Sequence, residues 1–217
     1  MAKPLAKLVA LPTPKRRWAQ FSLLSLFLVV TVLCVGLSLV VTPAERQRRA
    51  VAAIESLGGS VEYEEPDQEA SEAFPRPFLR RWLPQDYFDE VREVHFTRAP
   101  VTDDGLEHLR GLTGLQVLFL GGAHVTDSGL THLQRLTGLE ALWLNGTQVT
   151  DAGLAHLQGL TKLKSLDFSS TQVTDAGLVN LQRLSRLEWL DLTDTQVTNA
   201  GRAELQQALP NCRINGP

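Results

Sequence analysis

A 24-residue period occupies the second half of this chain. Four full copies begin at Val101, Val125, Val149 and Val173. A fifth, partial copy begins at Val197. Each copy starts Val-Thr-Asp/Asn-x-Gly, and each full copy then carries leucines at fixed intervals. A period in the twenties indicates a solenoid, in which each repeat buries its apolar face only against its neighbours.

Each repeat divides into a strand and a helical segment. The pattern x-x-Leu-x-Leu from Gln116 to Leu120 predicts a short strand with one apolar face. Strands one repeat apart run in the same direction, so they should form a parallel sheet at ~4.8 Å spacing. Leucines three apart between Asp151 and Leu160 predict a short helix, with Thr150 as its N-cap and Asp151 in its first turn. The recurring glycine, as at Gly153, predicts a close approach between successive coils.

The repeat resembles a known family. The pattern Leu163-x-x-Leu166-x-Phe168-x-x-Thr171-x-Val173 is similar to the leucine-rich repeat, whose cell is usually Leu-x-x-Leu-x-Leu-x-x-Asn-x-Leu. The resemblance covers about residues 77–217 and implies an α/β solenoid with strands on a concave face and short helices on a convex face. Threonine or Ala123 replaces the usual asparagine, which in the family bonds to backbone; threonine could do part of this and alanine could not. The whole layout resembles bacterial membrane-anchored leucine-rich repeat proteins.

The rhythm extends beyond the full copies at both ends. Counting back 24 residues places Phe88, Val91, Val94 and Phe96 in phase, so residues 77–100 should be an atypical cap. An alternating segment at 60–64 is the expected cover for the open edge of this cap. Four full repeats follow, over residues 101–124, 125–148, 149–172 and 173–196. Residues 197–217 form a C-terminal partial repeat.

The N-terminal part predicts a membrane anchor. Residues 21–41 carry no charge, and 21 helical residues cover the ~30 Å hydrocarbon core of a bilayer. The tail 1–20 holds five basic residues against three arginines just after the apolar run, which favours a cytoplasmic N-terminus and extracytoplasmic repeats in a single-pass signal-anchor protein. The alternative is a signal peptide cleaved after Ala44. Residues 42–59 should form a juxtamembrane helical stalk that ends at Gly58-Gly59, followed by a short strand and an acidic linker over 60–76.

Rows of side chains flank the strand leucines and should project from the concave face. One row reads His95, Phe119, Trp143, Asp167, Asp191, and the next reads Glu93, Val117, Ala141, Ser165, Trp189. Exposed aromatic side chains tend to mark interaction sites. We therefore expect a protein or peptide bearing apolar and basic groups to bind at Phe119, Trp143, Asp167, Trp189 and Asp191. The alternative is that the rings fold flat over the sheet or meet the N-terminal linker.

Other chemistry is poorly supported by the sequence. His108, His132 and His156 recur one repeat apart, and a row spaced by the solenoid rise converges poorly on zinc. Asp167 and Asp191 lack a pocket signature for catalysis, and the acidic outer part argues against nucleic acid. We expect no enzyme activity, cofactor, metal or small-molecule substrate. A structural or self-associating envelope spacer remains the alternative function, and the acidic run from Glu62 to Glu72 could dock a basic partner or a divalent ion.

Overall fold

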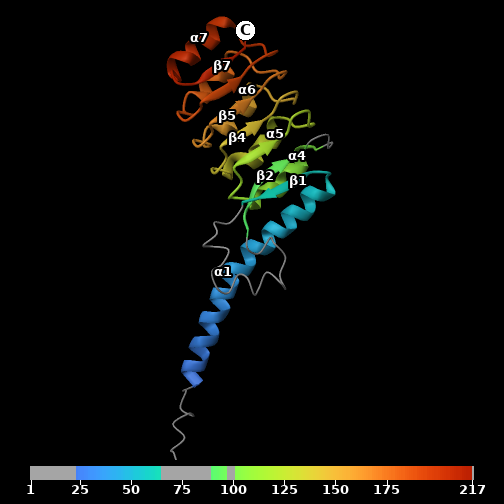
Figure 1. Ribbon diagram of the computed structural model, residues 1–217, viewed down its shortest axis with the longest axis vertical. Coiled ribbons are helices and arrows are strands. Elements are labelled where there is room, and N and C mark those ends of the chain that lie inside the picture. Colours follow the sequence, from blue (N-terminus) through green and yellow to red (C-terminus); the bar gives the residue numbers. More distant parts are fainter. Residues whose placement is uncertain (1–22, 65–88, 97–100, 217) are drawn as a thin grey trace, which may run out of the picture. The chain divides into compact units, whose positions relative to one another are not determined.

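The computed structural model describes residues 23–64, 89–96 and 101–216 (Figure 1). The chain divides into two compact units, residues 1–39 and 40–217, and the repeats lie in the second. Helix α1 (Leu23–Ser56) runs across that division. The basic tail, the acidic linker beyond residue 64 and the expected cap residues 77–88, including Phe88, lie outside the described residues.

A seven-stranded sheet follows the order of the chain. Six strands are parallel and pair in a register that advances by one repeat, so Leu118, Leu142, Leu166, Leu190 and Ile214 stand in line. This confirms the predicted parallel sheet. Their bounds are β2 (Val91–His95), β3 (Val117–Phe119), β4 (Ala141–Trp143), β5 (Ser165–Asp167), β6 (Trp189–Asp191) and β7 (Arg213–Asn215).

The first strand covers the N-terminal edge of the sheet. Strand β1 (Ser60–Tyr63) pairs antiparallel with β2, with Val61 opposite Val94 and Tyr63 opposite Val91. Its apolar side chains pack against the core. The strand predicted from the alternation at 60–64 therefore forms, and it occupies the edge where cover was expected.

Short helical segments line one side of the sheet (Figure 1). In the first three full repeats a single α-turn passes into a 3-10 turn, because Val-Thr-Asp-x-Gly begins a helix that the next leucines continue for only a few residues. Thr150 caps its helix as expected, since its hydroxyl oxygen accepts a hydrogen bond from the Ala152 N–H at 3.4 Å. The segments are α4 (Asp103–Leu106), η2 (Glu107–Gly111), α5 (Asp127–Leu130), η3 (Thr131–Arg135), α6 (Asp151–Leu154), η4 (Ala155–Leu157), η5 (Gly177–Leu181) and α7 (Asn199–Ala208).

The leucines between sheet and helices form one continuous core. Leu118, Leu142 and Leu166 are 0% exposed, as is Phe168, which takes the place of a leucine in its repeat. At the position of the family's asparagine, the Thr147 hydroxyl donates to the Leu144 carbonyl at 2.6 Å, and Ala123 is buried without such a bond. The expected partial replacement of asparagine by threonine is thus seen.

The end of α1 belongs to the repeat core and is not a stalk in water. Ala50 and Val51 are buried, and Ile54 is 0% exposed within the same hydrophobic cluster as the repeat leucines. The sequence reading missed this because the three residues form a short apolar stripe in an otherwise charged segment. The stripe covers apolar surface that the first coil would leave open. The helix ends where expected, with Gly58 at φ 80°.

Among the described residues, no helix combines the length and the apolar character needed to cross a membrane.

An aspartate–threonine ladder links successive coils on the helical side. The carboxylate of each motif aspartate accepts hydrogen bonds from both the N–H and the hydroxyl of the threonine one repeat later, at 2.6–2.8 Å. The hydroxyl bond from Thr198, and then its N–H bond, hold the pKa of Asp175 below its usual 3.8. The pairs are Asp103–Thr126, Asp127–Thr150, Asp151–Thr174 and Asp175–Thr198.

Candidate protein-binding face

Three aromatic rings stack across the outward face of β2, β3 and β4. The centroids of His95 and Phe119 lie 4.3 Å apart with planes at 15°. Those of Phe119 and Trp143 lie 4.1 Å apart with planes at 12°. The stack follows from the register, which places these residues directly opposite one another on neighbouring strands. We call His95, Phe119 and Trp143 the aromatic stack.

The rings of the aromatic stack are half-buried. They pack against one another in a row, one strand spacing apart. Part of each ring remains exposed on the outward face of the sheet.

Two carboxylates continue the same row. Asp167 stands opposite Trp143, and Asp191 stands opposite Asp167. One oxygen of Asp167 accepts hydrogen bonds from the Ser169 N–H at 2.8 Å and the Ser169 hydroxyl at 2.7 Å. One oxygen of Asp191 accepts from the Thr193 N–H at 2.8 Å. These local bonds fix the carboxylates, and the second oxygen of each has no hydrogen bond within the described part of the chain.

Trp189 lies apart from the aromatic stack. It occupies the neighbouring row, opposite Ser165 on one side and Arg213 on the other. It is half-buried, and it makes no ring-to-ring contact with the described aromatic residues. Of the five expected binding residues, the structure therefore brings Phe119, Trp143, Asp167 and Asp191 into one line and leaves Trp189 beside it.

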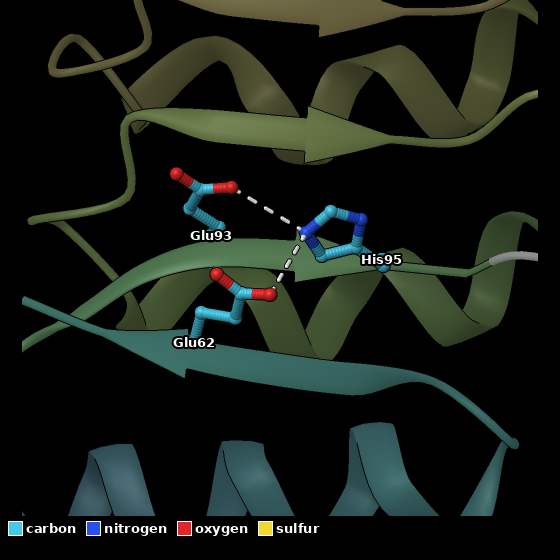
Figure 2. Close-up of side chains that lie close together, drawn as sticks. All are labelled: Glu62, Glu93 and His95. Atoms are coloured by element: carbon cyan, nitrogen blue, oxygen red, sulfur yellow. Dashed lines mark ion pairs between the residues drawn. The ribbon is translucent and has the colours of Figure 1, made fainter.

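A carboxylate pair at the start of the row was missed by the sequence reading. Figure 2 shows Glu62 of β1 and Glu93 of β2 converging on the imidazole of His95. The His95 Nε2 atom lies 3.4 Å from a Glu93 carboxylate oxygen and 4.0 Å from one of Glu62. The alternation at 60–64 does place Glu62 on the face opposite Val61. The 24-residue period does not determine how β1 pairs with β2, so the sequence could not show that Glu62 lies beside Glu93.

The recurring histidines stay on the helical side and do not converge. His108 is exposed, and the His156 Nδ1 atom lies 2.6 Å from the amide nitrogen of Gln134. In the described residues, the side chains whose metal-ligand atoms come together are Glu62, Glu93 and His95, and the recurring histidines are not among them.

The comparisons agree with this architecture. A model described as Leucine Rich repeat matches residues 159–181. No curated protein matches the chain. Residues 159–181 therefore match a leucine-rich repeat, and the register and core described above agree with the leucine-rich repeat fold.

Several solved structures are similar. The LRR ectodomain of the receptor kinase SOBIR1 from Arabidopsis thaliana has 15% identity and a TM-score of 0.51, and the match covers 79% of this chain and 91% of that one. An internalin (inlF) from Listeria monocytogenes has 28% identity and a TM-score of 0.43, over 51% of this chain and 32% of the internalin. Internalin C2 from the same organism has 25% identity and a TM-score of 0.42, over 51% of this chain and 55% of that one. The chain thus spans about a third and about half of the two internalins.

Proposed function

We propose that this protein is a non-catalytic binding module whose outward sheet face takes a protein or peptide segment. The observation that carries the proposal is the aromatic stack followed directly by Asp167 and Asp191. Aromatic side chains dominate binding energy at interfaces, and a stack already ordered in the free protein loses little further entropy on binding. Leucine-rich repeats host many functions, so the proposal rests on this site and not on the fold.

The spacing of the row defines the kind of ligand. Neighbouring strands lie ~4.8 Å apart, so Phe119 and Asp191 are separated by roughly 14 Å, or three strand spacings. An extended peptide advances about 3.3–3.6 Å per residue. A segment lying across the strands would therefore place an apolar side chain on the aromatic stack and a lysine or arginine about four residues away, at the free carboxylate oxygens.

The membrane anchor is a second part of the proposal. It is supported by the uncharged run 21–41 with its basic flank, and by three apolar side chains of α1, Phe27, Leu28 and Val30, which are 72%, 61% and 48% exposed. The N-terminus would be cytoplasmic and the repeats extracytoplasmic. Protease added to intact cells should then digest the repeats. N-terminal sequencing of the mature protein separates a retained anchor from cleavage after Ala44.

Photo-crosslinking tests the binding face. A crosslinking residue at position 143 should give a discrete adduct in the host's own membranes. The same residue at position 183, an exposed arginine beyond η5, is the matched control. A heterologous adduct at 143 that is absent at 183 supports the proposal, and equal labelling or no labelling at 143 contradicts it.

The spacer alternative rests on the outer edge of β7, the last strand of the sheet, which pairs with no further strand among the described residues. An unpaired strand edge can pair with another chain. Adducts between two copies of this chain, obtained with the crosslinker in β7, would favour self-association over ligand binding.

A further inference from the structure

Glu62, Glu93 and His95 gather three metal-ligand side chains on one face of the β1–β2 hairpin. Glu62 and Glu93 are directly opposed across the antiparallel pair, and His95 lies two residues beyond Glu93 on the same face. One ligand atom from each residue lies within 4.8 Å of the other two. Figure 2 shows both carboxylates directed at the same ring nitrogen.

Two carboxylates facing each other across a strand pair repel, which destabilises the hairpin unless a cation lies between them. The Glu62 side chain is 68% exposed and has room to turn into solvent, yet its carboxylate lies 4.0 Å from the His95 Nε2 atom. The Nε2 atom of His95 is shielded from solvent and makes no hydrogen bond to any described residue. A shielded imidazole nitrogen with two carboxylates around it is a set of donors that a bound cation would complete.

We propose that Glu62, Glu93 and His95 bind one divalent transition-metal ion of the zinc type. Zinc bonds of about 2.0–2.2 Å place two ligands of a tetrahedral ion about 3.4 Å apart. The His95–Glu93 separation is 3.4 Å, and the His95–Glu62 separation of 4.0 Å closes by a small rotation of the exposed glutamate. An imidazole ligand favours zinc over magnesium and calcium, which prefer oxygen donors throughout.

The position of the ion gives it two consequences. Glu62 belongs to β1 whereas the other two ligands belong to β2, so the ion crosslinks the strand that covers the edge of the sheet. His95 is also the first ring of the aromatic stack, so metal coordination orients the imidazole against Phe119. Three protein ligands leave a fourth position open to water or to a carboxylate. This inference is independent of the proposed peptide binding, and either can fail alone.

The test is calorimetric titration of zinc chloride into the full-length chain in detergent at neutral pH. We expect one ion per chain for the wild type, and a rise in melting temperature with zinc. Glu62→Gln and His95→Gln should each weaken zinc binding at least tenfold and abolish that rise. Matched controls are Glu64→Gln, an exposed glutamate two residues further along, and His156→Gln on the helical side, and both should bind as the wild type does.

Three outcomes would overturn the site. These are no zinc binding up to millimolar concentration, binding unaffected by Glu62→Gln, and binding lost equally in His156→Gln, which would show adventitious surface ligation. Glu62→Gln alters an exposed side chain outside the core, so it decides the matter even if His95→Gln fails to fold. A magnesium titration that gives the same heat as zinc would contradict the assigned ion class.

Discussion

The carboxylate of Asp151 accepts two hydrogen bonds from Thr174 in the next repeat, one from the backbone N–H at 2.8 Å and one from the hydroxyl at 2.6 Å. The same relationship recurs along the solenoid, so it links successive coils on the helical side as strand pairing links them on the other. It also explains why the motif ends in glycine. A Cβ at Gly177 would overlap the Asp151 carboxylate of the preceding repeat.

Asp151→Ala should lower the free energy of unfolding by about 1.5–3 kcal/mol, since it removes charge-assisted bonds between two coils. Urea denaturation of wild type and variant measures this. The control is Asp104→Ala, because Asp104 is an exposed acid in the first turn of α4. That change should stay within about 0.5 kcal/mol. Equal effects for the two variants would show that the ladder adds nothing to stability.

Gly153→Ala and Gly159→Ala should act in opposite directions. An added Cβ at Gly153 would overlap the Asp127 carboxylate and lie 3.0 Å from a Leu130 methyl, so we expect a loss of about 1–3 kcal/mol. At Gly159 the nearest atom to an added Cβ would be 4.0 Å away. We expect Gly159→Ala to raise the free energy of unfolding by about 0.4–1 kcal/mol, because alanine leaves the unfolded chain fewer conformations than glycine does. Thermal melts of both variants decide this, and a neutral Gly153→Ala would contradict the close approach.

A left-handed residue recurs once in each of the four full repeats, three residues after the end of strands β3 to β6. Gly122 and Gly146 have φ of 73° and 68°, whereas Ser170 and Asp194 hold the same position at 56°. Gly146→Ala should cost about 1 kcal/mol, because an L side chain disfavours this conformation. Ser170→Gly is the converse variant and should not destabilise. Chemical denaturation showing Gly146→Ala to be neutral would mean that the turn readily changes conformation.

Burial raises the pKa of the Cys212 thiol from 9.0 to about 11. The folded protein therefore favours the neutral thiol, and the stability linked to it is present below pH 9.0 and lost as the pH rises toward 11. The free energy of unfolding should fall more steeply over that window in wild type than in Cys212→Ala. Iodoacetamide labelling in a Cys34→Ser background should likewise require unfolding. Rapid labelling of the folded protein at neutral pH would contradict the buried thiol.

The 24-residue period was enough to predict the parallel sheet, the register and the buried leucines. Each such position faces the same surroundings in every repeat, so one periodic pattern reports on all of them. The period also predicted which side chains share the outward row, because strands in register bring Phe119 and Trp143 side by side. It did not predict that the rings would stack face to face, since their rotamers depend on side-chain packing.

What lies outside the period was harder to predict. The cap formed by Ala50, Val51 and Ile54 is a single helical stripe with no repeat to reinforce it. The meeting of Glu62 with Glu93 depends on the antiparallel register of β1, which contains an irregularity between Glu62 and Tyr63. The motif aspartate was predicted to complement its own helix, and its bonds to the next repeat were missed because they depend on the distance between coils.

The proposed binding of a partner by the aromatic stack is best tested by measuring the affinity of the crosslinked partner for variants of the stack. Trp143→Ala should weaken binding at least about 30-fold, as expected for a hot-spot residue worth about 2 kcal/mol or more. Trp189→Ala reports on the neighbouring row, and Arg183→Ala on the helical side should change affinity less than about twofold. Circular dichroism must show that all three variants are folded. A folded Trp143→Ala variant that binds as tightly as wild type would contradict the proposed role of the aromatic stack.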